Sequence, residues 1–179
     1  MTDCNAVTIR VLAPEESHKH ISVLSDILID CVEGGASVGF MAPLSRDRAD
    51  AFWTAVADGV AAGQRTVLIA EDAETDSVVG TVQLVFGQPE NQPHRADVAK
   101  MLVHRRARRR GIAASLMRSA ERAALAAGKT LLVLDAVTGG DAERLYLSLG
   151  WTRVGVIPGY ALFPDGRPCA TTYCYKRLA

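Results

Sequence analysis

A run of basic residues is the strongest candidate for chemistry in this sequence. It lies between an expected strand and an expected helix, where unpaired backbone N–H groups and the positive end of the helix dipole both favour an anion. We therefore expect a phosphate-bearing ligand here, the alternative being a solvated basic loop. No acidic residue interrupts the run, whose basic members are Lys100, Arg105, Arg106, Arg108, Arg109 and Arg110.

Within this run, residues 108–113 have the form R-x-x-G-x-A. The small residues Gly111 and Ala113 leave room for backbone amides to approach a pyrophosphate. Other phosphate signatures fail: Gly128-Lys129-Thr130 resembles the end of a P-loop, but the glycine which that pattern needs is Ala123, and there is no G-x-G-x-x-G. Triphosphate hydrolysis and dinucleotide redox chemistry are therefore poorly supported.

The length and composition of the chain indicate what kind of protein contains this basic run. The chain has 179 residues, of which 49% are hydrophobic and 22% charged, with 20 basic and 20 acidic side chains. These values predict one folded domain, residues 1–179, and argue against disorder. A net charge of zero argues against non-specific binding of nucleic acid.

The cysteines and the N-terminal residues indicate the cellular compartment in which we expect the protein. The four cysteines form no C-x-x-C pair, so we expect free thiols in a reducing cytoplasm and no zinc site. Neither an export signal nor a stretch of about 18 apolar residues is visible, so no membrane contact is expected. A monomer and a homodimer both remain open.

Hydrophobic periodicity and turn residues predict alternating strands and helices. Residues 158–168 are expected to form a turn-rich connection between the last two strands. Strands are expected near residues 8–12, 66–70, 78–86, 96–103, 131–134, 151–157 and 171–178, the fifth of them buried on both sides, and helices near 21–32, 45–62, 112–127 and 141–149.

A family resemblance joins these elements. The strand at 98–103, the R-x-x-G-x-A turn, the helix after it and the segment 142–151 together resemble the GCN5-related N-acetyltransferases (GNAT). The resemblance implies an α/β GNAT fold, a mixed central sheet of about six to seven strands with helices on both faces. It also implies transfer of an acetyl group from acetyl-coenzyme A, as co-substrate and without a metal, to an amine.

The resemblance also assigns residues to the coenzyme. The pantetheine arm would pair with Met101, Leu102 and Val103, and the pyrophosphate would bind at Arg108, Arg109, Arg110, Gly111, Ile112 and Ala113. Tyr146 would protonate the departing thiolate, a role that a phenol with a pKa of about 10 suits; the alternative is a packing tyrosine. Gly139 occupies a position where the family often has asparagine.

A narrower likeness, to the tabtoxin-resistance members of the family, concerns the acceptor. It rests on residues 34–41, 95–98, 134–135, 151–155 and 158–160. It implies that Asp97 and Asp135 serve as acidic groups in one cleft, with Gly35, Ser37 and Phe40 contacting the substrate. Strand-end carboxylates and a loop that plugs the core are the alternatives, and His94 is a weaker candidate base.

The sequence therefore predicts an N-acetyltransferase that acts on a primary amine of a small molecule, with a tabtoxin-like toxin or an antibiotic as the candidate acceptors. A protein-lysine or protein N-terminal acetyltransferase is the second possibility. A coenzyme A-binding module without turnover is the third, and the presence of Tyr146 counts against it.

Overall fold

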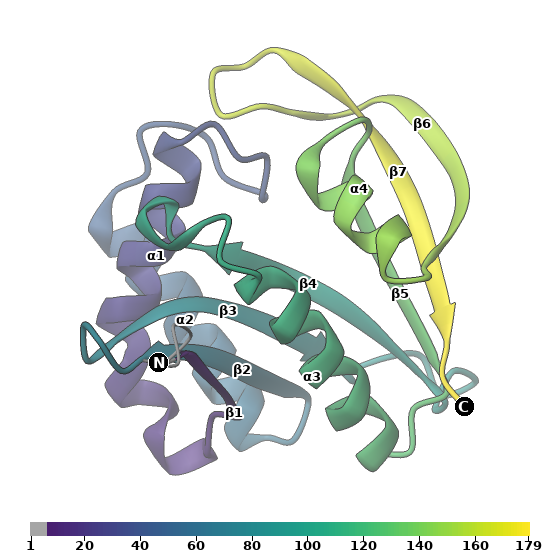
Figure 1. Cartoon of the computed structure of the whole chain (residues 1–179), viewed down its shortest axis with the longest axis horizontal. Helices are drawn as coiled ribbons and strands as arrows, with labels where there is room; N and C mark the ends of the chain where they lie inside the picture. The colour runs from purple at the N-terminus through teal and green to yellow at the C-terminus, as the bar shows by residue number, and fades with distance from the viewer. Residues whose placement is uncertain (1–6) are drawn as a thin grey trace, which may run out of the picture.

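A computed structural model describes residues 7–179 (Figure 1). Within these residues seven strands form one sheet in the order β1-β2-β3-β4-β5-β7-β6. Every neighbouring pair is antiparallel except β4 and β5, which are parallel. The strands are β1 (Val7–Val11), β2 (Arg65–Asp72), β3 (Ser77–Val85), β4 (Arg95–Val103), β5 (Leu131–Val137), β6 (Thr152–Leu162) and β7 (Pro168–Arg177).

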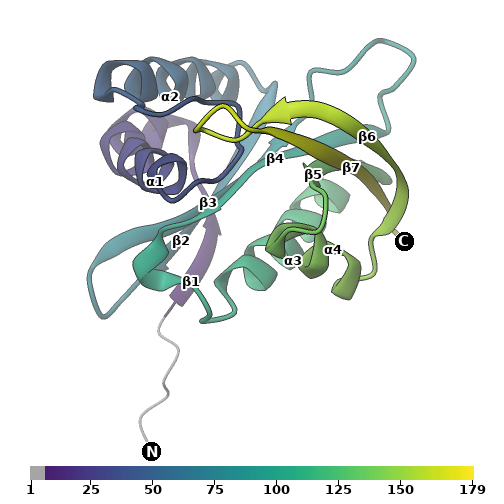
Figure 2. The ribbon, with the colours of Figure 1, turned by 90° about the horizontal axis from the view of Figure 1, so that it is seen from above.

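Helices cover both faces of this sheet. Figure 2 shows α1 and α2 on one face and α3 and α4 on the other. The α-helices are α1 (Ile21–Glu33), α2 (Arg46–Ala61), α3 (Ile112–Ala126) and α4 (Asp141–Ser148), and the short 3₁₀ helices are η1 (Pro14–His20) and η2 (Arg105–Ala107). The arrangement confirms the expected mixed α/β sheet with helices on both faces.

Each face has its own core. On one side α3 packs against β1 to β4 through a stripe that includes Leu116, Met117 and Ala120, and Tyr146 of α4 joins this core. On the other side α1 and α2 bury Leu28 and Trp53 against the sheet. The central strands β2 and β3 are therefore buried between two helical layers, as their apolar runs require, whereas β6 is largely exposed.

Most expected elements lie within a few residues of their observed positions because local signals define their ends. The Ser45 hydroxyl caps α2 by accepting a hydrogen bond from Arg48 N at 3.4 Å. Two expectations were wrong. β6 continues through Pro158 and Gly159 to Leu162, with an irregular register against β7, and in β5 only alternate residues are fully buried, since its other face lies beside the region where β4 and β5 separate.

That separation is the feature that positions the site. β4 and β5 are paired only over residues 95–97 and 131–133. Beyond these pairs the two strands diverge, as Figure 1 shows. The edge of β4 that faces β5 therefore has no strand partner from Val98 to Val103 among the described residues. We call this region the β4–β5 split.

Candidate active site

The connection from β4 to α3, residues 104–111, forms what we call the basic loop. Its backbone turns through two left-handed positions, Arg109 with φ of 64° and Gly111 with φ of 74°. Ile112, Ala113 and Ala114 follow in the first turn of α3, where N–H groups have no intrahelical carbonyl partner. A Cβ added at Gly111 would meet no protein atom within 4 Å. Small residues and unpaired amides therefore meet at one helix start, as an anion requires.

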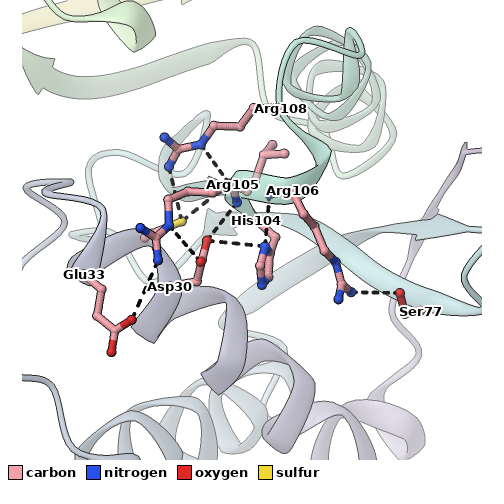
Figure 3. Close-up of polar contacts among 9 residues, drawn as sticks. Asp30, Glu33, Ser77, His104, Arg105, Arg106 and Arg108 are labelled. Carbon is pink, nitrogen blue, oxygen red and sulfur yellow. Dashed lines mark hydrogen bonds and ion pairs between the residues drawn. The ribbon is translucent and has the colours of Figure 1, made fainter.

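Much of the positive charge of the basic loop is neutralised by other parts of the protein (Figure 3). Asp30 of α1 accepts hydrogen bonds from Arg105 N at 2.8 Å and Arg105 Nε at 2.9 Å. Its carboxylate also lies 3.4 Å from His104 Nδ1. Burial alone would raise the pKa of Asp30, but the bonds from Arg105 outweigh it and lower that pKa. Asp30 thus anchors the start of the loop to α1.

The later arginines of the loop also have protein partners. Arg110 donates to the buried carboxylate of Asp72 at 2.6 Å. Arg109, which is largely exposed, lies 3.5 Å from Asp141. Arg108 donates to the Val103 carbonyl at 3.3 Å. The contacts with Asp72 and Asp141 could not be predicted from the sequence, because these acids lie 38 and 32 residues away from Arg110 and Arg109.

Tyr146 lies in α4, beside β5 and the split. Its side chain is buried, and its ring centroid lies 6.0 Å from that of Trp151. Burial raises the pKa of the Tyr146 phenol well above its ordinary value, and the charge of Asp135 adds to this. The phenol therefore stays protonated at neutral pH, as a proton donor must.

The turn before α4 holds Gly139 in the left-handed region, with φ of 74°. Gly139 N donates to the buried carboxylate of Glu143, which also pairs with Arg153. This turn is therefore fixed by contacts within the chain at the position where the family often has asparagine.

Asp97 and Asp135 lie on the same face of the sheet. Asp97 pairs in register with Val133, two residues before Asp135, and side chains two apart on a strand share a face. Ala96 and Leu132, their neighbours, point into the opposite core. The structure therefore brings the two expected acids to one side of the β4–β5 split.

The two carboxylates differ in their surroundings. Asp97 forms an ion pair with Arg95 and accepts a hydrogen bond from Gln88 Nε2 at 2.9 Å. Asp135 has no ion pair among the described residues. Desolvation raises the pKa of Asp135, Lys100 opposes this rise, and Asp97 adds to it. The unpaired Asp135, whose pKa is raised, is thus the better candidate for a proton acceptor than Asp97, which is held by Arg95 and Gln88.

Two tyrosines extend this face toward the β6–β7 hairpin. Tyr173 pairs in register with Asp135, and its hydroxyl lies 2.7 Å from that of Tyr160. The hydrogen bond with Tyr160, together with burial and the nearby acids, raises the pKa of Tyr173 to about 12. The Tyr173 phenol therefore stays protonated at neutral pH, and its hydrogen bond with Tyr160 places two hydroxyl groups beside the acids.

The connection between α1 and α2 meets the tip of the β6–β7 hairpin, as Figure 2 shows. Ser37 Oγ donates to the Leu162 carbonyl at 2.7 Å, and Ala42 N donates to the Pro164 carbonyl at 3.1 Å. Phe40 packs edge-on against Phe52 of α2, with ring centroids 5.3 Å apart. Gly35 ends α1 in the left-handed region and is exposed. Ser37 thus contacts the β6–β7 hairpin, and Phe40 contacts α2.

The described residues give little support for a metal site, a disulfide or a membrane-spanning helix. No group of three or more His, Cys, Asp or Glu side chains within residues 7–179 could hold a metal ion. The thiols of Cys31, Cys169 and Cys174 are free and buried, while Cys4 lies outside the described residues. None of the helices in this range is long and apolar enough to span a membrane.

Comparison with known families decides the class. The model of the acetyltransferase (GNAT) family matches residues 24–151, most of the chain. The chain belongs to this family. It is therefore an acetyl-CoA-dependent N-acetyltransferase, which confirms the enzyme class expected from the basic loop and the segment that carries Tyr146.

Solved structures resemble this acetyltransferase in fold. A Sinorhizobium meliloti phosphinothricin acetyltransferase, solved with AcCoA, shares 16% identity at a TM-score of 0.76 over 97% of this chain and 89% of its own. A Brucella melitensis ribosomal-protein-alanine N-acetyltransferase shares 21% identity at a TM-score of 0.79, over 96% of this chain and 99% of its own. A Staphylococcus aureus N-acetyltransferase shares 18% identity at a TM-score of 0.77, over 97% of this chain and 99% of its own. These names include a small-molecule and a protein acceptor, so the fold does not decide the acceptor.

Proposed function

We propose that this acetyltransferase moves the acetyl group of acetyl-CoA to a primary amine of a small molecule. The observation that carries the choice of a small acceptor is the contact between the α1–α2 connection and the β6–β7 hairpin. Two hydrogen bonds, from Ser37 to Leu162 and from Ala42 to Pro164, join these loops beside the split. Loops joined in this way favour a confined acceptor over a folded protein or an extended peptide chain.

In this proposal the coenzyme lies along the split. The edge of β4 at Met101, Leu102 and Val103, which has no strand partner, pairs with the amides of the pantetheine arm. Because the Val103 carbonyl accepts a hydrogen bond from Arg108 at 3.3 Å, that bond has to give way where the arm uses this carbonyl. The amides at the start of α3, from Gly111 onward, bind the pyrophosphate. Arg108 and Arg109 add positive charge at the surface, whereas the guanidinium of Arg110 holds Asp72 and shapes the loop.

The proposed chemistry is direct transfer between two bound substrates. Asp135 removes a proton from the acceptor ammonium, directly or through water, and the amine nitrogen attacks the thioester carbonyl. The new C–N bond forms, the C–S bond breaks, and Tyr146 gives its proton to the departing sulfur. The acetylated nitrogen then loses its second proton, which restores the Tyr146 phenol through water, and Asp135 returns the first proton to solvent. The products are the N-acetyl compound and coenzyme A thiol. Asp97, held by Arg95, contributes charge to the acceptor side.

A tabtoxin-like toxin is the specific candidate that the likeness of residues 34–41 supports. A panel of amines tests the proposal, comprising small amines, such toxins, antibiotics, lysine peptides and peptides with free N-termini. Thiol release and the mass of the acetylated product are both measured with acetyl-CoA. We expect amine-dependent release with small molecules. Faster acetylation of peptides would favour the protein acetyltransferase instead, and coenzyme binding without turnover of any amine would favour a binding module.

A further inference from the structure

Lys100 occupies an irregular position in β4. The register between β3 and β4 shifts between Thr81 and Gln83, so that Lys100 and Met101 together lie opposite Val82. Lys100 has φ of 49°, which is uncommon for a residue other than glycine. A bulge of this kind changes the direction of a side chain, and such strained positions concentrate at functional sites.

The bulge moves Lys100 to the face that carries the two acids. Before it, Ala96 and Val98 point into the core beneath α3. After it, Leu102 points into the core beneath α1 and α2. Strict alternation would place Lys100 with Ala96 and Val98. Instead its ammonium lies 5.4 Å from the centre of the Phe52 ring of α2, on the face shared with Asp97.

The ammonium of Lys100 has an incomplete set of partners. Within residues 7–179 the Lys100 ammonium makes no hydrogen bond and no ion pair; it lies against the Phe52 ring and close to Gly39, where an added Cβ would be 3.7 Å from Nζ. By comparison, Lys176 donates to both oxygens of Glu121 and to the Leu149 carbonyl. Burial lowers the pKa of Lys100, while Asp135 opposes this and Arg65 adds to it. A partly buried cation without a counter-ion is unfavourable unless a ligand supplies one.

Neighbouring groups beside Lys100 are also hydrogen-bond donors. Gln83 pairs in register with Ala99, next to Lys100, and is fully buried. Its Oε1 accepts a hydrogen bond from Arg65 at 3.1 Å, whereas its Nε2 has no partner among the described residues. Two cations and an amide donor therefore gather around Lys100, whose charge interacts with that of Asp135. This set suits an anionic group that lies close to an amine.

We propose that Lys100 binds a carboxylate of the acceptor, so that the acceptor is a free amino acid whose amine lies at Asp135. The inference rests on the proposed function, because it identifies the class of small amine. Arg65 and Gln83 support the same carboxylate from the side of β2 and β3. The opposite charges of Lys100 and Asp135 then orient the two charged ends of the amino acid.

The test compares matched acceptors that differ only in the anion. Each amino acid of a panel is supplied as the free acid, the carboxamide and the decarboxylated amine, and kcat/KM is measured for acetyl transfer. We expect the free acid to be preferred by about 10- to 100-fold, the range for a hydrogen-bonded charge pair. In Lys100→Met this preference should fall to about unity, chiefly through KM, and Lys100→Arg should retain part of it.

Lys129→Met is the matched control. Lys129 also lies 5.4 Å from a phenylalanine ring, that of Phe86, but after α3 and away from the split. The Lys129→Met variant should keep the wild-type preference for the free acid over the carboxamide. Because the amines of acid and amide differ equally in basicity for every variant, the change in the ratio reports on Lys100 alone.

Each outcome has one meaning. A wild-type enzyme that acetylates amides or amines as well as acids overturns the carboxylate site and leaves the small-amine function standing. An acid-to-amide preference that survives in Lys100→Met overturns the role of Lys100, even if kcat falls for all acceptors. Absence of transfer to every small amine would refute the proposed function together with this inference.

Discussion

The basic loop and the β4–β5 split use charge in opposite ways. In the basic loop, Arg105 and Arg110 are held by Asp30 and Asp72, acids that other elements supply. Beside the split, Lys100 has no acidic partner within hydrogen-bonding distance in the described residues, and Asp135 has none that is basic. Charges paired within the protein shape the loop, while the unpaired charges are the ones available to a ligand.

This difference changes how the basic run should be interpreted. A count of arginines suggests a surface that binds anions through side chains. The contacts instead indicate that Arg105 and Arg110 position the loop, so that backbone amides at the start of α3 face the ligand. In the function that we propose, specificity for the acceptor depends on a few unpaired groups at the split, where each charge has a larger effect.

Gly111→Val should have the largest effect, because it places a branched side chain where the pyrophosphate would approach the amides. We expect acetyl-CoA affinity to fall at least about 100-fold, equivalent to losing roughly 3 kcal/mol of binding energy. Calorimetry measures the affinity, and thermal unfolding reports on the fold.

Gly128→Val, at the opposite end of α3, is its control. Both glycines have φ of 74°, and at neither would an added Cβ meet a protein atom within 4 Å. The two variants therefore carry a similar backbone strain of about 1–2 kcal/mol. Equal binding by both variants would remove the basic loop as the coenzyme site.

Tyr146→Phe should come next, with kcat lowered about 10²- to 10³-fold and acetyl-CoA affinity changed only a few-fold. The ring keeps its contact with Trp151 and loses only the hydroxyl. Since burial raises the pKa of Tyr146, its deprotonation should not limit the wild-type rate at mildly alkaline pH. Single-turnover kinetics separate chemistry from product release, and an unchanged rate there would leave Tyr146 a packing residue.

Local patterns in the sequence were sufficient for the fold but only partly for the site. Helical periodicity, Ser45 as a cap and the R-x-x-G-x-A turn are short-range signals, and they located the helices and the basic loop. The partners of the arginines were not predictable, because Asp30 and Asp72 lie 75 and 38 residues away from Arg105 and Arg110. Tertiary structure alone brings them together.

The position of Lys100 was hidden for a different reason. In sequence it counted as one more member of the basic run, at the end of a strand. A bulge of one residue reverses the alternation of β4 and moves Lys100 to the side of Asp97. Nothing in residues 96–103 marks the bulge, although a lysine among apolar strand residues is itself a signal that its side chain needs a polar or anionic neighbour.

The smallest expected effects provide a direct test of the contrast, because neutralising one acid in each region should change stability in opposite directions. Arg110 holds the pKa of Asp72 below its usual range, mainly through a hydrogen bond. The folded state therefore binds this proton more weakly than the unfolded chain, and ionised Asp72 stabilises the fold above the unfolded pKa of about 3.9. Asp72→Asn should lower the melting temperature at pH 7, and the loss should shrink only as the pH falls below about 3.9 and through the lowered folded pKa of Asp72.

Asp135 should behave in the reverse way, since desolvation raises its pKa in the folded state. The folded state then binds the proton more tightly, so stability declines as the pH rises from the unfolded pKa of about 3.9 through the raised folded value. Asp135→Asn should raise the melting temperature at pH 7 while it lowers acetyl transfer, and the gain should vanish near pH 4. Melting curves of both variants at pH 4 and pH 7 decide the matter. Destabilisation by both at pH 7 would mean that Asp135 is held by the protein and is not a charge kept available for the acceptor.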